Sequence, residues 1–160
     1  MEATSTMGPL ANSRRIDAME AIICDSKARG AKIMAGGQRC GNRGYFFQPT
    51  VITDIPDESV LMTKEPFGPI VPIVPFKTFD EVVERANSLP LGLAAYAFTS
   101  SSATAHAIGD EIEAGMVGVN SVAVSTPETP FGGVKESGYG SEGGIEGLQA
   151  FLKTKFISQA

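Results

Sequence analysis

Cys40 is the residue of this chain most able to start chemistry by itself. It lies in GGQRCG, residues 36–41, with Arg39 and Arg43 as nearby positive charges. A nucleophilic cysteine normally needs a partner base that stabilises its thiolate. The single histidine, His106, lies far along the chain in an alanine-rich stretch. Two interpretations stay open here: an activated thiol, or an ordinary thiol in a glycine-rich surface turn.

A glycine-rich segment at residues 138–143, GYGSEG, has the G-x-G-x-x-G spacing of a dinucleotide-binding turn. That spacing binds a pyrophosphate only when a strand precedes it, a helix follows, and an acidic residue comes about 20 positions later. The preceding residues, TPFGGVKES, are not typical of a strand, and no such acid follows. We therefore do not interpret this segment as a cofactor fingerprint.

The composition restricts the class of protein. The chain has 160 residues, of which 42% are apolar and 19% charged, as expected for one globular domain. Its net charge of −5 argues against nucleic acid or an anionic membrane as a partner. Cys24 and Cys40 predict neither a disulfide framework nor a metal site. With no charged-then-apolar leader and no long apolar run, we expect a cytoplasmic location.

Apolar periodicity alternates between helical and extended segments along the chain. In the first expected helix Ile16, Met19, Ile22 and Ile23 share one face, and the spacing from Thr78 to Glu81 predicts a capping box. The expected helices are residues 12–29, 78–88, 101–114 and 145–152. The expected strands or extended segments are residues 31–37, 45–55, 69–76, 93–100 (of the buried type), 115–120 and 155–159.

This alternation predicts an α/β fold with a largely parallel sheet. We expect residues 1–154 to form one domain and residues 155–160 to form a separate terminal strand. Residues 121–144 are rich in Gly, Ser, Thr and Pro and have little periodicity. Irregular stretches of this length are usually functional or packed against something else.

Seven motifs occur in the order in which they occur in one enzyme family. The first to stand out is EPFGP at residues 65–69, which has the E-x-F-G-P pattern. The others are MGPL (7–10), GYFFQPTV (44–51), LGLAAYAFT (91–99), GMVGVN (115–120), PFGGVKESGYGSEGG (130–144) and GLQAFLKTKF (147–156). Together they cover nearly the whole chain. In these motifs the chain resembles the NAD(P)-dependent aldehyde dehydrogenase superfamily.

The resemblance bears directly on Cys40. The family's nucleophile segment also contains G-Q-x-C, but it precedes the MGPL run, which here begins at Met7. Cys40 instead lies in the family's turn and strand downstream of the nucleophile. The resemblance therefore implies a C-terminal part of the catalytic domain, with no catalytic residue in this chain. The nucleophile, the general base, the oxyanion-hole asparagine and the nucleotide-binding half would precede Met1.

The resemblance implies roles for four residues. Glu65 matches the glutamate that accepts hydrogen bonds from the nicotinamide ribose, and Phe67 the aromatic residue packed beside it. Phe131 matches an aromatic residue near the aldehyde tunnel, although it could equally anchor the loop as a core residue. Ser125 lies where succinate-semialdehyde dehydrogenases carry a serine that binds the substrate carboxylate. Glu65 could also be an ordinary surface acid, and Ser125 an ordinary loop serine.

These matches imply a parent enzyme that uses NAD or NADP to oxidise a small-molecule aldehyde, with succinate semialdehyde as the favoured substrate. The isolated chain is expected to be inactive. The terminal strand is expected to join a neighbouring subunit, which makes the parent a homo-oligomer. Two alternatives stay open: a non-catalytic assembly module derived from the family, and a small thiol enzyme that uses Cys40.

Overall fold

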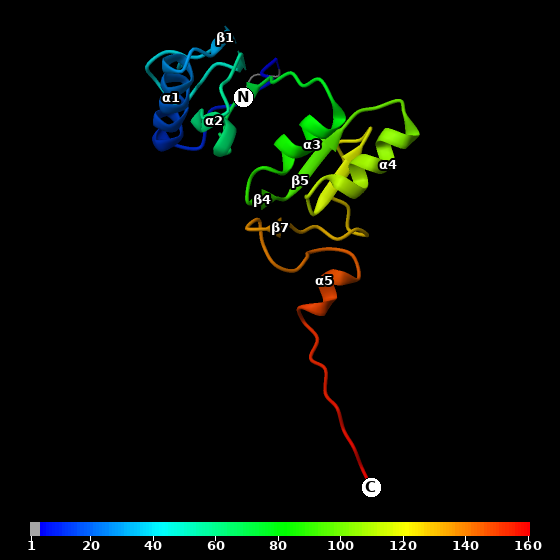
Figure 1. Cartoon of the computed structure of the whole chain (residues 1–160). Coiled ribbons are helices and arrows are strands. Elements are labelled where there is room, and N and C mark those ends of the chain that lie inside the picture. Colours follow the sequence, from blue (N-terminus) through cyan, green and yellow to red (C-terminus); the bar gives the residue numbers. More distant parts are fainter. Residues whose placement is uncertain (1–3) are drawn as a thin grey trace. The chain divides into compact units, whose positions relative to one another are not determined.

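The computed structural model describes residues 4–160 and divides them into two compact units. The first unit ends at Pro75 and the second begins at Phe76. Each unit has its own helices and strands (Figure 1). The expected α/β class is confirmed, and each unit is described by itself below.

The first unit combines two helices with a three-stranded sheet. The strand order is β1-β2-β3, with β1 antiparallel to β2 and β2 parallel to β3. The elements are α1 (Ser13–Ala28), β1 (Lys32–Ala35), β2 (Thr50–Thr53), α2 (Val60–Thr63) and β3 (Ile70–Pro72).

One face of α1 forms the core of this unit, as the apolar periodicity predicts. All four residues of the predicted face are buried, and Met19 has no exposed surface. They pack with Phe47 and Ile52, which are also almost fully buried. Each such side chain contributes about 1.5–3 kcal/mol relative to an exposed one. The α1 face is therefore the main support on which the rest of the unit is built.

The strand predicted over residues 45–55 is much shorter in the structure. Strand β2 begins only at Thr50, directly after Pro49. Proline has no N–H to donate to a ladder, so the strand starts after it. Before Pro49, Phe47 makes a single bridge to Arg39, while Tyr45 and Phe46 are exposed. The aromatic residues thus belong to a loop that carries one buried anchor, Phe47.

The second unit contains three helices and two small sheets. Strands β5 and β6 pair in parallel, and β4 and β7 pair antiparallel. In sequence α4 lies between β5 and β6, as in a βαβ unit. The elements are α3 (Phe79–Asn87), β4 (Leu91–Gly92), β5 (Ala94–Ala97), α4 (Ser102–Glu111), β6 (Met116–Val119), β7 (Val134–Lys135) and α5 (Glu146–Gln149).

The start of α3 confirms the capping signal in the sequence. The Thr78 hydroxyl accepts a hydrogen bond of 3.2 Å from the Glu81 N–H. The Glu81 carboxylate reaches back and accepts one of 2.9 Å from the Lys77 N–H, one residue before the cap. Side-chain caps of this kind satisfy N–H groups that a helix leaves unpaired at its first turn.

The predicted largely parallel sheet is not confirmed. The strands form three separate sheets, and two of the four strand pairs are antiparallel. Residues 93–100 were expected to be a buried strand, and this was wrong: Tyr96 is 49% exposed and Phe98 is 70% exposed. The physical reason is the small size of the β5–β6 sheet, since two strands offer too few neighbours to cover both faces.

The end of the chain also differs from expectation. Helix α5 spans four residues instead of eight, and residues 155–159 are not assigned to a strand. Figure 1 shows them as an extended tail that leads away from α5. Phe156 and Ile157 are 89% and 76% exposed. A strand needs a hydrogen-bonding neighbour, and the described chain offers none to this segment.

Candidate functional site

The loop between α2 and β3 carries the two residues predicted to contact a cofactor. Glu65 and Phe67 are both exposed, and the Phe67 side chain retains 72% of its accessible surface. Pro66 and Gly68 on either side of Phe67 are partly buried. The loop therefore points one carboxylate and one aromatic ring outward from a backbone that is held against the unit.

Helix α1 holds this backbone at two points. The Arg15 guanidinium donates a hydrogen bond from Nη2 to the Pro66 carbonyl oxygen. One helical turn further along, the buried Met19 side chain lies directly under Gly68. A Cβ at position 68 would lie 2.3 Å from the Met19 sulfur, so only glycine fits without moving the core. The loop can approach α1 this closely because position 68 has no side chain.

Phe67 has a left-handed backbone conformation, with φ of +43°. For a bulky residue this conformation is a genuine outlier and costs on the order of 1–3 kcal/mol. Such conformations persist only where the surrounding structure enforces them, and they cluster at functional sites. The contacts of Arg15 and Met19 on either side of Phe67 supply that constraint.

Asp25 fixes the short helix α2 that leads into the loop. Its Oδ2 accepts hydrogen bonds from the Ser59 hydroxyl at 3.0 Å and from the Val60 N–H at 2.9 Å. Its Oδ1 accepts one of 2.7 Å from Arg29. These bonds, first that from Arg29 and then that from the Val60 N–H, lower the pKa of Asp25. The carboxylate thereby joins α1 to the N-terminus of α2.

The exposed Glu65 carboxylate is chemically able to accept hydrogen bonds from a diol such as the ribose of a nicotinamide nucleotide. Within residues 4–160, no hydrogen bond or ion pair occupies its carboxylate, so both oxygens can accept from a ligand. A carboxylate has two acceptor oxygens, and a vicinal diol offers two O–H donors. Phe67, two residues further along the chain, exposes an apolar ring. These residue types therefore suit the diol and the apolar part of such a group.

Ser125 and Phe131 lie together in the second unit. Both line a hollow of about 460 Å³, with Thr126, Pro127, Glu142 and Gly143 as the other lining residues. The backbones of Phe131 and Glu142 exchange two hydrogen bonds, of 2.6 Å and 2.8 Å. This pair closes the irregular stretch into a loop and holds Phe131 at its wall. The structure thus brings the two predicted substrate residues to one hollow.

Lys135 anchors the same loop to two helix ends. Its ammonium group donates to the carbonyl oxygens of Asn87 at 2.9 Å and Leu89 at 3.0 Å, at the end of α3. It also forms an ion pair with Glu113, just beyond α4. Positive charge at a helix C-terminus satisfies unpaired carbonyls and interacts favourably with the helix dipole.

The chain matches one known protein family over nearly its whole length. The sequence model of the aldehyde dehydrogenase family matches residues 1–157. The chain belongs to the aldehyde dehydrogenase family. The resemblance in the sequence motifs is therefore confirmed.

Relatives and solved structures agree with this membership. A 4-(hydroxymethyl)benzenesulfonate dehydrogenase of Comamonas testosteroni is 46% identical over 98% of this chain and 33% of its own. A mitochondrial succinate-semialdehyde dehydrogenase of rice, Oryza sativa, is 40% identical over 98% of this chain and 30% of its own. An aldehyde dehydrogenase of Bacillus cereus in complex with NAD+ superposes with a TM-score of 0.91 at 38% identity, covering 96% of this chain and 31% of that one. The chain spans about a third of the length of these relatives.

In this aldehyde dehydrogenase chain, Cys40 lies in a surface turn. It is exposed, and its N–H donates a 2.9 Å hydrogen bond to the Phe46 carbonyl. The neighbouring Arg39 guanidinium is directed at the Gly44 carbonyl, 2.9 Å away. His106, the candidate partner base for such a cysteine, is exposed on α4 in the second unit. The described residues also contain no cluster of three or more His, Cys, Asp or Glu suited to a metal ion.

The glycine-rich residues 138–143 do not form a dinucleotide-binding turn. They follow β7, which pairs antiparallel with β4, and they precede a helix of only four residues. A dinucleotide turn needs a parallel βαβ unit whose helix N-terminus faces the pyrophosphate. Residues 138–141 instead line a hollow together with Phe131 and Glu142.

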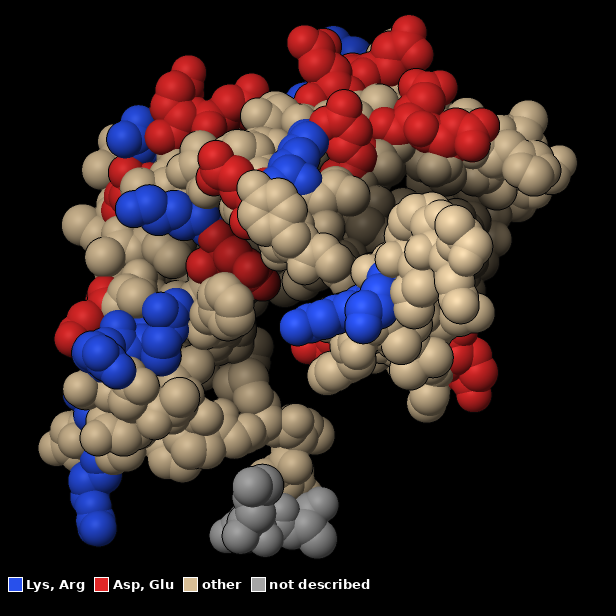
Figure 2. All heavy atoms as spheres, turned by 90° about the horizontal axis from the view of Figure 1, so that it is seen from below, with Lys and Arg blue, Asp and Glu red and all other residues tan. Residues whose placement is uncertain are grey.

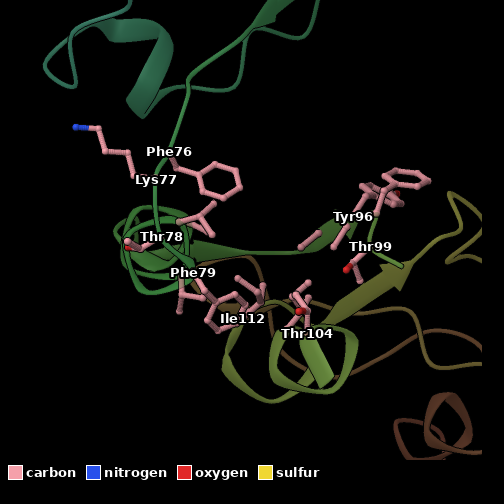
Figure 3. Close-up of a pocket in the computed structure, with 15 residues that line it drawn as sticks. Phe76, Lys77, Thr78, Phe79, Tyr96, Thr99, Thr104 and Ile112 are labelled. Atoms are coloured by element: carbon pink, nitrogen blue, oxygen red, sulfur yellow. The ribbon is translucent and has the colours of Figure 1, made fainter. Parts of the chain in front are cut away.

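An apolar cavity of about 550 Å³ lies between α3, β5 and α4. Figure 3 shows Phe79 and Ile112 on its inner side, whereas Lys77 extends away from it. Apart from Lys77, none of its lining residues carries a charge. The cavity is therefore lined mainly by apolar side chains, and no Asp, Glu, His or Cys of residues 4–160 lines it.

Two further observations concern the charged surface and the helices. On the face shown in Figure 2, Lys and Arg side chains are scattered, and Asp and Glu gather more densely. No helix among residues 4–160 is both long and apolar enough to cross a bilayer.

Sequence reasoning did not identify Arg15, Asp25 or Lys135. Arg15 and Met19 are four residues apart in the predicted first helix, a spacing that places them on one side. That spacing is a usable signal, but it does not say which loop the arginine meets. Asp25 also bonds Ser59 and Val60, and Lys135 bonds Asn87 and Leu89, all 34 or more positions away, where short-range patterns carry no information.

Proposed function

We propose that this chain is the C-terminal part of the catalytic domain of an NAD(P)-dependent aldehyde dehydrogenase that oxidises an aldehyde to a carboxylic acid. The observation that carries the proposal is the constrained loop that presents Glu65 and Phe67 outward. The NAD+ complex of the related Bacillus cereus enzyme supports a nicotinamide cofactor.

When bound, NAD(P)+ supplies the hydride acceptor. In this proposal the Glu65 carboxylate accepts hydrogen bonds from both ribose hydroxyls and so fixes the rotation of the nicotinamide end. Phe67 packs against the same end and limits its movement. Holding two reactants in one orientation can lower a barrier by several kcal/mol, so a small displacement of this loop has a large effect on rate.

On the substrate side, Ser125 and Phe131 form one wall of the aldehyde site. The Ser125 hydroxyl can donate a hydrogen bond to a substrate carboxylate, which favours a semialdehyde such as succinate semialdehyde. The rice relative, named for that substrate, supports this choice. Phe131 contributes an apolar surface for the aliphatic part of the molecule.

The nucleophilic cysteine and the general base belong to a part of the enzyme that this chain does not supply. The isolated chain should therefore show no turnover. Purified chain is incubated with NAD+ or NADP+ and with succinate semialdehyde, acetaldehyde or benzaldehyde, and nicotinamide reduction is followed by absorbance. Turnover that co-purifies with the chain and disappears in a Cys40→Ser variant would contradict this and restore the thiol-enzyme alternative.

A joined enzyme tests the positive side of the proposal. Residues 1–157 replace the matching third of the rice succinate-semialdehyde dehydrogenase, and the unaltered rice enzyme is the reference. We expect aldehyde oxidation by the joined enzyme. Glu65→Gln should raise KM for the nucleotide or lower kcat about 10- to 100-fold, because a charged acceptor is lost. A folded but inactive joined enzyme would contradict the proposal.

Substrate choice is tested in the same joined enzyme. Ser125→Ala should raise KM for succinate semialdehyde about tenfold, as expected for one hydrogen bond to a charged group. KM for butanal, which has no carboxylate, should not change. Equal changes for both aldehydes would show that Ser125 shapes the loop without recognising the carboxylate.

Assembly and location belong to the same proposal. Residues 155–159 would form a strand against a neighbouring subunit, which their extended backbone and the exposed Phe156 and Ile157 support. The two free cysteines suit a reducing compartment such as the cytoplasm. Cross-linking of the joined enzyme with and without the tail tests the first point, and imaging of the tagged protein tests the second.

A further inference from the structure

We propose that Arg15 is a positioning residue for the nucleotide loop: it sets the orientation of the peptide between Pro66 and Phe67. This role rests on the proposed function, because it gives the cofactor contacts of Glu65 and Phe67 their geometry. Arg15 itself would touch neither the cofactor nor the aldehyde.

Arg15 contacts Pro66, the residue between Glu65 and Phe67 in the sequence. Arg15 is on α1, 51 positions before Pro66, and its side chain is partly buried. Its Nη2 donates to the carbonyl oxygen of Pro66, which belongs to the peptide unit that joins Pro66 to Phe67. That carbonyl is therefore one of the two points at which α1 holds the loop, and the one nearer to Glu65 in the sequence.

Fixing one carbonyl restrains the two torsions beside it. Because the peptide unit is planar, a rotation of the Pro66–Phe67 peptide changes ψ of Pro66 and φ of Phe67 together when the chain on both sides is held, and Gly68 is held against Met19. The proline ring already holds φ of Pro66 near −65°. With φ of Phe67 held at +43°, the backbone fixes the directions in which the Glu65 side chain and the Phe67 ring leave the loop. Without Arg15, Phe67 would relax toward the ordinary negative-φ regions.

Arg15 has no competing role among the described residues. No acidic partner forms an ion pair with its guanidinium, and its buried Nε has no hydrogen-bond partner. Arginine is the preferred residue for buried ion pairs with carboxylates. Here the guanidinium donates to a backbone carbonyl of the loop instead, so its contact acts on the loop backbone.

Met19 and Gly68 make this a two-point support. The close approach at Gly68 restrains the far side of Phe67, and Arg15 restrains the near side. Met19 belongs to the core, so its removal would disturb the whole unit. Arg15 does not belong to the core cluster, and its substitution can therefore separate loop geometry from folding.

The first test uses the 160-residue chain and hydrogen exchange read by mass spectrometry. Arg15→Gln is compared with Arg15→Lys, which retains one donor, and with Arg14→Gln, an exposed neighbour on the same helix. In Arg15→Gln, amides of residues 64–70 should exchange about tenfold faster, while those of residues 16–23 stay protected. Arg15→Lys should restore most of the protection. Unchanged exchange in the loop, or equal acceleration along α1, would overturn the proposal.

The second test uses the joined enzyme and separates two kinetic constants. Arg15→Gln should raise KM for the nucleotide about tenfold and leave KM for the aldehyde unchanged, with partial rescue by lysine. Faster amide exchange in residues 64–70 without any change in nucleotide KM or kcat would overturn the positioning role. If the unaltered joined enzyme folds without activity, the proposed function has failed, and the exchange experiment still decides whether Arg15 sets the loop.

Discussion

Ser59 donates a 3.0 Å hydrogen bond to Asp25, although the two residues are 34 positions apart in the sequence. The same carboxylate oxygen accepts from the Val60 N–H, the first residue of α2. This link ties α1 to the element that leads into the Glu65–Phe67 loop, and it makes the stability of the first unit depend on pH.

The stability of the chain should therefore fall in acid, in part through Asp25. Its hydrogen bonds lower its pKa in the folded state below the ordinary value of 3.8. The stabilising contribution is thus fully present above that value and is lost as pH falls through the folded pKa. Urea unfolding at pH values from about 2.5 to 6 should show a flatter dependence for Asp25→Asn than for the wild type.

Asp17 provides the matched control. It is an exposed acid on the same helix, and Asp17→Asn should keep the wild-type pH dependence. Parallel curves for Asp25→Asn and the wild type would show that the carboxylate is not ionised preferentially in the folded state.

Lys135 should contribute to the stability of the second unit. Lys135→Met keeps most of the side-chain volume but leaves two carbonyls at the end of α3 and the Glu113 carboxylate without their donor. A loss of about 1–3 kcal/mol is expected for a hydrogen-bonded charge of this kind. Lys153→Met, in the exposed tail, should have no effect. Equal unfolding midpoints for the two variants would contradict the anchoring role.

Gly115 should not tolerate a side chain. A Cβ there would lie 1.9 Å from the Gly132 carbonyl oxygen, next to Phe131, so the backbone of one segment would have to move. Gly115→Ala should lower the thermal midpoint by several degrees, as expected for a loss above about 1 kcal/mol. Gly109 lies in α4 with open space around it. Gly109→Ala should stabilise the chain by about 0.5–1 kcal/mol, which separates crowding from the loss of glycine itself.

Cys40 should behave as an ordinary thiol. It lies in an exposed turn whose neighbouring arginine is already bound to a carbonyl. Iodoacetamide should modify Cys40 at a rate similar to that of Cys24, which is also exposed. In the joined enzyme Cys40→Ser should leave kcat unchanged. Selective alkylation of Cys40 by a factor of ten or more would indicate an activated thiol.

The isolated chain should self-associate. Phe98, Phe156 and Ile157 are 70–89% exposed, and apolar surface removed from water gains about 25 cal/mol per Å². Light scattering after size exclusion should detect species larger than a monomer. Serine at both Phe156 and Ile157 should reduce association, whereas Tyr139→Ser, at an exposed site outside the tail, should not. A monodisperse wild-type monomer would show that this segment is self-sufficient.

Features of the fold that depend on residues close together in the sequence were predicted correctly, and features that depend on distant residues were not. Helix α1 and the cap of α3 followed from residues within a few positions of one another, and both predictions were confirmed. The strand at residues 45–55 was predicted too long, because aromatic and β-branched content does not show where a neighbouring strand is missing. The burial of β5 depends on residues far away in the sequence. The pairing of residues 155–159 depends on a strand partner that residues 4–160 do not supply.

For the candidate site, the motifs identified the proposed ligand-contacting residues but not the residues that support them. Motif resemblance identified Glu65, Phe67, Ser125 and Phe131. The structure places Glu65 and Phe67 on one loop of the first unit, and Ser125 and Phe131 at one hollow of the second unit. Their roles remain proposals. The supporting residues Arg15 and Asp25 lay outside the motifs, and Lys135 lay inside one without an assigned role. Each acts through contacts to residues distant in the sequence, which short-range patterns do not reveal.

The left-handed backbone at Phe67 implies a compromise between stability and activity. Glycine at this position would adopt the same conformation without the steric cost, so Phe67→Gly would relieve strain and remove an exposed apolar ring. Selection for stability alone would favour that exchange. A phenylalanine held in this conformation is expected only where the ring is needed for something other than folding. Directed evolution for heat resistance alone should therefore lose this ring early, and selection for turnover should keep it.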